Sequence, residues 1–398
     1  MRAVGLVSLT AVSINTTIGA GIFALPATVA QLLGGTGPLA YLAAGAAVLL
    51  IVSCFAELGG RFESTGGPYV YARAAFGSFI GFEVALLYVL ARLTAVAAVS
   101  NTFSDYLGYF WPVLTHGAGR LCAITFMIGT LAFIQFIGVR VGTVVNNIFT
   151  VGKLLPLIAF CLAGMYFLDF HPILAIPVPK ASSLQQASLL LLFALGGFEN
   201  ASIPTEEVID PRKTLPRALF ASVGLVVVLY LVIQVVAMAA LPGLAASATP
   251  LASAARNFLG PGGSLLLTAG ALVSTAGTNH VNLFVGPRLL YALGRDGQLP
   301  ARMARLHPVY RTPAFSIWLY AVAGWVLAIS SAFAPLAALS ALARLLMYAL
   351  LVSRRWRCAG ARRRCKADSP FPAALSFRWL RWGCAVGCSP GVRSNSVR

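Results

Sequence analysis

The sequence predicts an all-α protein that crosses a membrane many times. Of its 398 residues, 59% are hydrophobic and only 10% are charged, whereas soluble domains carry roughly 25% charged residues. Long apolar stretches recur along the chain, and about 20 apolar residues are enough for a helix to span a bilayer. The net charge of +18 divides between loops and the C-terminal tail, so it does not indicate nucleic-acid binding.

Hydropathy predicts ten membrane spans. They cover residues 6–34, 37–58, 79–110, 119–138, 142–168, 185–208, 215–241, 263–293, 314–331 and 335–353. The first span continues past the apolar core of a signal peptide, so we expect no cleavage.

Basic residues in the loops predict the orientation of the chain. With the N-terminus inside, the cytoplasmic segments hold eleven of them, namely Arg2, Arg61, Arg73, Arg140, Arg212, Lys213, Arg217, Arg295, Arg302, Arg305 and Arg311. The opposite side holds three, namely Arg120, Lys180 and Arg256. This bias predicts a multi-pass protein of the cell (inner or plasma) membrane with both termini in the cytoplasm.

Two glycine-containing interruptions fall at the depth where a membrane helix should be continuous. They are Thr17-Ile18-Gly19-Ala20-Gly21-Ile22-Phe23 in the first span and Phe193-Ala194-Leu195-Gly196-Gly197-Phe198-Glu199 in the sixth. Glycine favours a helix break, and unpaired backbone groups survive in a membrane only where they line a cavity. The pair therefore predicts a binding site at the bilayer midplane. The alternative is close helix packing through small residues.

Four motifs in chain order carry a resemblance to a known family. They are Gly19-Ala20-Gly21-Ile22-Phe23 with Pro26; Gly59-Gly60-Arg61 with Gly66-Gly67-Pro68-Tyr69-Val70-Tyr71; Gly197-Phe198-Glu199 through Glu206-Glu207, Asp210-Pro211 and Pro216; and Tyr291 with Arg295-Asp296-Gly297 and Pro300. Together they resemble the signatures of the amino acid/polyamine/organocation transporters, over residues 1–353.

The resemblance implies the leucine-transporter-like fold. Two five-helix repeats of opposite orientation, residues 6–168 and 185–353, would have discontinuous first and sixth helices. Helices 1, 2, 6 and 7 would move as a bundle against a scaffold of helices 3, 4, 8 and 9. Relatives usually continue with two further helices, which this sequence lacks after residue 353.

Such a fold implies a site for the two charged groups of an amino acid. Free N–H groups around Ile18, Gly19 and Gly21 would face the carboxylate, because a helix N-terminus attracts anions. Carbonyls of Phe193, Ala194 and Leu195 would face the ammonium group. By motif register, Thr17, Ala20, Gly196 and Asn282 would also line the pocket, and Phe193 would be a gate. The alternatives are packing for Phe193 and interhelical hydrogen bonding for Asn282.

Basic residues inside the predicted spans need a role, because burying their charge is costly. Lys153 matches a lysine that in some family members replaces a sodium ion beside the first-helix break, which implies proton coupling. The alternative is a permanently charged link between two helices. Arg92 would contact substrate or pair with Glu199 or Glu57, and we expect the structural pair. Arg344 is assigned no role.

The expected function is secondary active transport of amino acids by alternating access. No spare carboxylate is evident for a second ammonium group, so we expect neutral substrates, taken up with protons. The alternatives are an amino acid exchanger, or a non-transporting sensor or inactive truncated permease. No phosphate-binding loop, metal motif or catalytic triad is present in the sequence, so we expect neither an enzyme nor a metal or other cofactor.

The tail departs from the resemblance. Residues 354–398 contain eleven Arg or Lys, one acid at Asp368 and four cysteines at 358, 365, 384 and 388. We expect a basic cytoplasmic segment that is disordered, or encoded in a shifted reading frame, or held on anionic membrane lipid. The cysteine spacings do not fit common zinc patterns.

Overall fold

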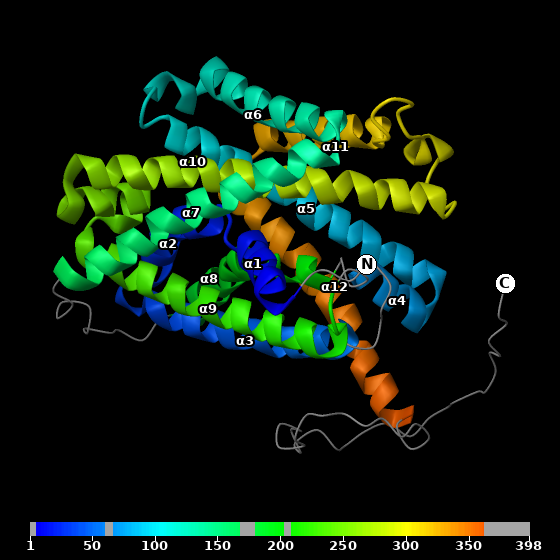
Figure 1. Ribbon diagram of the computed structural model, residues 1–398. Coiled ribbons are helices and arrows are strands. Elements are labelled where there is room, and N and C mark those ends of the chain that lie inside the picture. The colour runs from blue at the N-terminus through cyan, green and yellow to red at the C-terminus, as the bar shows by residue number, and fades with distance from the viewer. Residues whose placement is uncertain (1–4, 60–66, 168–179, 203–207, 362–398) are drawn as a thin grey trace. The chain divides into compact units, whose positions relative to one another are not determined.

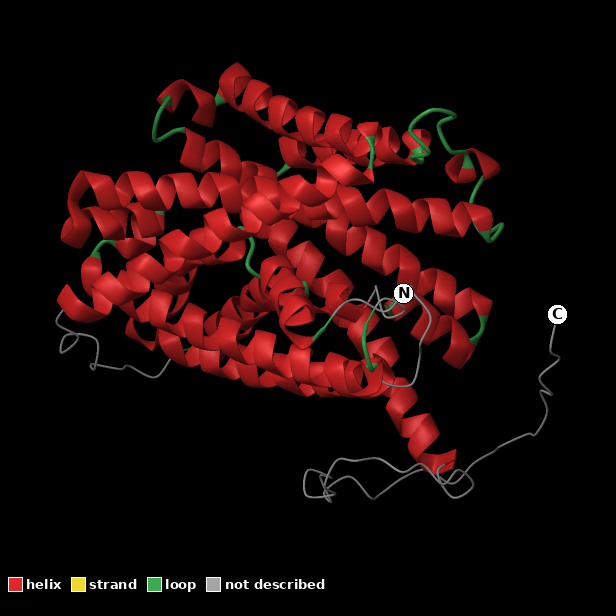
Figure 2. Cartoon of the chain, in the orientation of Figure 1, coloured by secondary structure: helices red, strands yellow, loops and turns green. Residues whose placement is uncertain are grey.

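The computed structural model describes residues 5–59, 67–167, 180–202 and 208–361, and helices make up most of these ranges (Figures 1 and 2). Seven helical segments among them are long and apolar enough to cross a membrane. Three shorter apolar helices accompany these segments, at Leu6–Thr17, Val151–Phe167 and Ala314–Ser330. The expectation of an all-α, multi-pass membrane protein is therefore confirmed, with seven segments meeting the length and hydropathy requirement where ten spans were expected.

The helices follow one another in a simple order. The α-helices are α1 (Leu6–Thr17), α2 (Gly21–Leu33), α3 (Gly37–Gly59), α4 (Pro68–Phe76), α5 (Ser78–Leu107), α6 (Gly117–Ile137), α7 (Val139–Phe167), α8 (Ala181–Leu195), α9 (Pro211–Ala240), α10 (Pro250–Arg295), α11 (Ala314–Ser330) and α12 (Phe333–Ala361). Short 3₁₀ helices lie between them, including η4 (Phe198–Ser202) and η7 (Ala301–Ala304).

Proline and glycine explain several helix boundaries. Pro68, Pro211 and Pro250 occupy the first turns of α4, α9 and α10, where the missing N–H of proline has no helical partner to lose. Within α10, Gly260 has φ +67 and ψ −162 and precedes a proline. The two parts of α10 therefore meet at a kink, close to residue 263, where the sequence predicted that the span begins.

Two groups of packed helices stand out among the described residues before residue 357. In one group α5 packs against α6, α10 and α11; in the other α3 packs against α8 and α9, and α1 packs against α9. In Figure 1 the first group lies above and the second below, with α1 seen near the middle. Helix α7 contacts both α10 and α9, and α2 contacts α8 and α10. Contacts of α1 with η4 and of α2 with α8 bring the two glycine-containing interruptions together.

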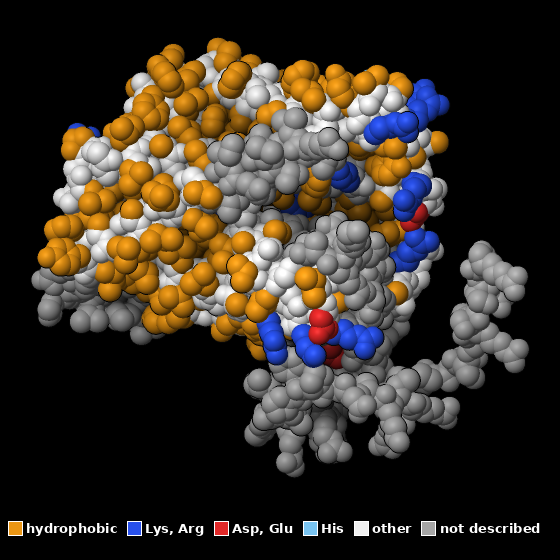
Figure 3. All heavy atoms as spheres, in the orientation of Figure 1, with side chains coloured by type: hydrophobic (Ala, Val, Ile, Leu, Met, Phe, Trp, Pro, Cys, Tyr) orange, Lys and Arg blue, Asp and Glu red, His pale blue; other side chains and the backbone are white. Residues whose placement is uncertain are grey.

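The surface of the described helices is rich in apolar side chains. Figure 3 shows hydrophobic side chains over most of the described surface of one face, with charged side chains gathered mainly toward its right and lower edges. Phe126 and Leu162, for example, are 73% and 68% exposed. Large contiguous apolar surface of this kind is typical of contact with lipid.

Contacts divide the chain into two units, residues 1–356 and 357–398. The described part of the second unit is the end of α12. Residues 362–398 lie outside the described residues, and so do residues 1–4. The expectations for the basic tail, and the cytoplasmic location of both termini, stay predictions.

Candidate functional site

The first interruption separates two helices. Helix α1 ends at Thr17, Ile18 is extended with φ −74 and ψ 102, and α2 begins at Gly21. The N–H groups of Phe23 and Ala24 both bond to the carbonyl of Ala20, at 3.0 and 3.1 Å. The N–H groups of the residues before Phe23 lie in the first turn of α2, where no preceding helical carbonyl is available to accept from them.

Side chains from other helices satisfy the carbonyls at the end of α1. The ammonium of Lys153, in α7, donates to the carbonyl oxygens of Asn15 and Ile18, the latter at 2.7 Å. The hydroxyl of Tyr230, in α9, donates to the carbonyl of Thr17 at 3.2 Å. Lys153 is 1% exposed, and a cation at the C-terminal end of a helix is stabilised by the helix dipole.

The second interruption requires glycine for two reasons. Helix α8 ends at Leu195, Gly196 is extended, and Gly197 has φ +121 before η4 begins. A Cβ on Gly197 would also overlap the carbonyl oxygen of Thr16. Both the backbone conformation and the close approach to α1 therefore exclude a side chain at this position.

The two interruptions are in direct contact. The hydroxyl of Thr16 donates to the carbonyl of Gly197 at 3.0 Å. A Cβ on Gly21 would lie 2.6 Å from the Cβ of Ala194, so the start of α2 and the end of α8 touch only because residue 21 is glycine. Segments about 180 residues apart in the sequence thereby form one wall.

This wall borders a pocket of about 370 Å³, part of which is open to solvent. Its lining residues are Thr16, Thr17, Gly19, Ala20, Gly21, Arg92, Ala95, Val99, Phe193, Ala194, Gly196, Gly197, Thr278, Asn282 and Arg344. The figure of 370 Å³ includes space that is open to solvent, so the pocket is a partly open site rather than an enclosed cavity.

The pocket brings together most of the candidate residues. Those that line it are Thr17, Gly19, Ala20, Gly21, Phe193, Ala194, Gly196 and Asn282. Ile18 and Leu195 do not line it, and both are fully buried. Phe193 makes an edge-to-face contact with Phe333 of α12, with ring centroids 5.8 Å apart, so an aromatic pair covers this part of the wall.

Arg92 lies in a buried polar network. One guanidinium nitrogen donates to Asn282 Oδ1 at 2.9 Å, and the other donates to the hydroxyl of Tyr88 at 2.9 Å and to Asn200 Oδ1. The same nitrogen is 3.6 Å from Glu199 Oε1. Arg92 thus both lines the pocket and pairs with Glu199, one of the two partners considered from the sequence.

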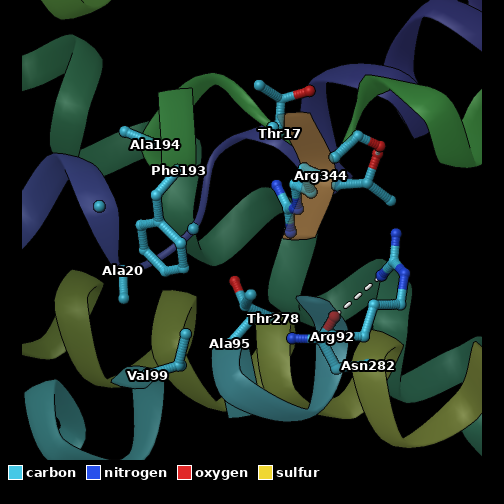
Figure 4. Close-up of a pocket in the computed structure, with 15 residues that line it drawn as sticks. Thr17, Ala20, Arg92, Ala95, Val99, Phe193, Ala194, Thr278, Asn282 and Arg344 are labelled. Carbon is cyan, nitrogen blue, oxygen red and sulfur yellow. Dashed lines mark hydrogen bonds between the residues drawn. The ribbon is translucent and has the colours of Figure 1, made fainter. Parts of the chain in front are cut away.

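Arg344 is the functional candidate that the sequence analysis passed over. It is 6% exposed, lines the pocket from α12, and has its Nε 3.9 Å from Glu199 Oε1. In Figure 4, Phe193 and Ala20 lie toward one side of the pocket, Arg92 and Asn282 toward the other, and Arg344 between them. The available signal was an arginine inside an apolar span, since such charges face the interior of a membrane protein.

Other lining residues were also missed. They are Thr16, Ala95, Val99, Gly197 and Thr278. Small and apolar side chains of this kind carry no signal that separates a pocket wall from ordinary helix packing. Among the described residues, no group of three or more His, Cys, Asp or Glu is arranged to hold a metal ion.

Apolar membrane-crossing helices around a small polar pocket, bordered by two opposed helix ends, define a membrane permease. The chain belongs to the amino acid permease family, whose model matches residues 4–393. The resemblance inferred from the four motifs is thereby confirmed. The match also extends into the basic tail, where composition had led us to expect divergence.

The chain is similar to named transporters of amino acids and to one transporter of methylthioribose. The chain is 29% identical to the human large neutral amino acids transporter small subunit 2 over 420 residues, covering 98% of this chain and 78% of the relative. It is 31% identical to the mouse Asc-type amino acid transporter 1 over 330 residues, covering 78% and 62%. It is 27% identical to the methylthioribose transporter of Bacillus subtilis over 339 residues, covering 80% and 72%. The family and these relatives are transporters rather than enzymes.

Proposed function

We propose that this chain is a secondary active transporter that takes up an amino acid by alternating access, with a proton as the coupled ion. The observation that carries the proposal is the meeting of two opposite helix ends at one pocket: the N-terminal end of α2 and the C-terminal end of α8. An N-terminal end attracts the α-carboxylate and a C-terminal end attracts the α-ammonium group. Only a zwitterion satisfies both ends together.

In this proposal α1 and α2 are the two halves of a discontinuous first span. Helices α8 and η4 are the two halves of a discontinuous sixth span, and the two spans are equivalent in a 5+5 inverted repeat. The packing supports this division, because α5, α6, α10 and α11 form one group and α1, α3, α8 and α9 form another. Alternating access is then a movement of the second group against the first. Phe193 acts as the gate that closes the pocket over its substrate.

Lys153 is the proposed coupling residue. Its ammonium donates to the carbonyls of Asn15 and Ile18, and among the ion pairs of the described residues none includes it. The contact between α7 and the end of α1 therefore depends on the ammonium charge. Loss of the proton to the cytoplasm would weaken this contact and release α1, while reprotonation from outside would restore it. A proton and a substrate would then cross in the same cycle.

The side-chain chemistry of the pocket argues against cationic substrates. No carboxylate is among the described residues that line the pocket, and nearby Glu199 is paired with Arg92 and Arg344 and accepts from Tyr348 and the Gly197 N–H. A second substrate ammonium would meet two arginines. We therefore propose substrates without a cationic side chain.

Uptake of radiolabelled amino acids into proteoliposomes tests this function. We expect uptake that is stimulated several-fold by an inward proton gradient in the wild type. Lys153→Met should abolish the response to the gradient, because the variant has no proton to exchange, whereas Lys180→Met, at an exposed lysine before α8, should retain it.

Three outcomes would contradict the proposal in different ways. Uptake that needs internal substrate and ignores the gradient would assign the chain as an exchanger. Binding without uptake would assign a sensor or an inactive permease. A full gradient response in Lys153→Met would remove Lys153 from the coupling mechanism while leaving transport itself in place.

A further inference from the structure

Three buried charges line or border the pocket, and they do not cancel. Arg92 and Arg344 are 2% and 6% exposed, and Glu199 is fully buried. One carboxylate faces two guanidinium groups, so this side of the pocket carries a net positive charge. An uncompensated charge buried in a membrane protein is costly unless it pairs or serves a function.

The carboxylate is held mainly through one of its oxygens. Its Oε2 accepts from the Gly197 N–H at 2.8 Å and from the Tyr348 hydroxyl at 3.1 Å. Its Oε1 lies 3.6 Å from Arg92 and 3.9 Å from Arg344 and accepts no hydrogen bond among the described residues. Glu199 is thus held in place between its neighbours and compensates one positive charge.

Arg92 is also held, because its two terminal nitrogens donate to Asn282, Tyr88 and Asn200, and only its Nε lacks a hydrogen-bond partner among the described residues. Arg344 has fewer partners. Its side chain is only 7% exposed, its Nε lies 3.9 Å from Glu199 Oε1 without a hydrogen bond, and its Nη1 has no hydrogen-bond partner either. Buried guanidinium N–H groups are normally satisfied, so two unsatisfied ones on a pocket wall point to a ligand.

The space for this guanidinium depends on Gly196. A Cβ at that position would overlap Nη1 of Arg344, so the glycine that ends α8 also admits the arginine to the pocket. A further unsatisfied donor, Nδ2 of Asn282, lies on the same pocket wall. In Figure 4, Arg92 and Asn282 lie together, and Arg344 lies between them and Phe193. The pocket wall therefore carries unsatisfied donors from both Arg344 and Asn282.

We propose that Arg344 binds an anionic group on the side chain of the substrate, so that the site selects amino acids with an acidic side chain. The inference rests on the proposed function and deepens it. The α-carboxylate is assigned to the start of α2, which leaves the guanidinium of Arg344 for a second anion. A guanidinium matches a carboxylate with two parallel hydrogen bonds and compensates its charge. From the sequence we expected neutral substrates, because no spare carboxylate was evident. The inference replaces them with substrates that have an acidic side chain.

The test compares each acidic amino acid with its amide, because glutamate and glutamine, or aspartate and asparagine, have nearly the same shape. We expect the wild type to prefer the acids by about tenfold or more in kcat/KM. Arg344→Met should remove most of this preference by lowering uptake of the acids, while uptake of the amides changes by no more than about threefold. Arg344→Lys, which keeps the charge without the two-pronged geometry, should be intermediate.

Arg288→Met is the matched control. Arg288 is half-buried in α10, lies over the ring of Phe284 at 3.6 Å, and does not line the pocket, so its loss should leave the acid-to-amide ratio unchanged. Folding of each variant is checked by gel filtration and thermal unfolding in detergent. If Arg344→Met fails to fold, the thermal shift that glutamate and glutamine cause in the wild type decides the question.

The outcomes separate this inference from the function on which it rests. A wild type that takes up or binds amides as well as acids overturns the inference and leaves amino acid transport intact. Equal loss of both classes in Arg344→Met, with a folded protein, also overturns it, because Arg344 would then bind the α-carboxylate or hold the structure. Absence of any amino acid uptake or binding contradicts the proposed function itself.

Discussion

The hydroxyl of Thr16 donates a hydrogen bond to the carbonyl of Gly197 at 3.0 Å. This bond joins the last turn of α1 to the break after α8, and the glycine has φ +121. A side chain at the first interruption therefore supplies a donor to a backbone carbonyl at the second. In a membrane this matters, because water does not supply the missing partners.

Replacing Gly197 by alanine should destabilise the protein and abolish transport. The new Cβ would overlap the carbonyl oxygen of Thr16, and the positive φ adds a strain of roughly 1–3 kcal/mol. We expect a clear fall in the thermal unfolding temperature in detergent, together with loss of uptake.

Gly224→Ala is the control for this substitution. Gly224 lies within α9, and a Cβ added there would have no neighbouring atom within 4 Å, so alanine should be neutral or stabilise by up to about 1 kcal/mol. A Gly197→Ala protein as stable as Gly224→Ala would show that the break tolerates a side chain.

The packing of α3 on α9 depends on Gly45. A Cβ there would lie 2.6 Å from one methyl of Val227 and 3.0 Å from the other, but 3.4 Å from its Cβ. Gly45→Ala should therefore destabilise the protein, and adding Val227→Ala should restore part of the loss because the clashing methyls are gone. A thermal-unfolding double-mutant cycle should give a coupling of roughly 0.5–3 kcal/mol. Simple additivity of the two substitutions would refute the contact.

The hydroxyl of Tyr230 supports both interruptions, since it lies 3.2 Å from the carbonyl of Thr17 and 3.4 Å from that of Ala194. Tyr230→Phe leaves these buried carbonyls with one donor fewer and should cost about 1–3 kcal/mol of stability. Tyr109→Phe, at a tyrosine that is 40% exposed, should change stability by less than about 0.5 kcal/mol. Equal unfolding temperatures for the two variants would mean that Tyr230 contributes only through its ring.

A network outside the spans predicts a pH effect. Tyr69 in α4 donates to Asp296 Oδ2 at 2.9 Å, and Arg73 donates to the same oxygen at 2.6 Å. Burial raises the pKa of Tyr69 above its ordinary value of 10.0, and the hydrogen bond to Asp296 adds to the effect. The folded state thus favours the neutral phenol, so its contribution to stability is present below pH 10 and is lost as the pH rises above that value.

Tyr69→Phe isolates this contribution, because the other tyrosines are the same in both proteins. Between about pH 9 and pH 11, the unfolding temperature of the wild type should fall more steeply than that of the variant. Parallel curves would mean that the phenol of Tyr69 ionises as easily in the folded protein as in the unfolded chain.

Much of the architecture could be read from local sequence. Apolar stretches predicted the helices within a few residues in most cases, as for α11, expected at 314–331 and found at Ala314–Ser330. Gly19, Gly21, Gly196 and Gly197 lie close to the places where α1 and α8 end, because glycine permits backbone conformations that other residues avoid. Family membership followed from four short motifs in order.

The pocket was predicted less completely. Lys153 was assigned to the end of α1 by resemblance, and its ammonium bonds to the carbonyls of Asn15 and Ile18. Arg344 was left without a role, because a basic residue near the end of a span fits snorkelling to the interface as well as burial. Its neighbours Gly196 and Glu199 lie about 150 residues earlier in the chain, and no local pattern connects them.

The sequence by itself predicted a helical membrane protein from composition and hydropathy, and its four motifs placed it among the permeases. Its glycines also lie where α1 and α8 end, because glycine acts on the local backbone of one helix. The tertiary structure alone decided that Arg344 enters the pocket beside Gly196, that Gly197 touches Thr16, and that Tyr69 meets Asp296. Those contacts depend on how distant helices pack, and hydropathy indicates that a residue is buried without indicating its partner.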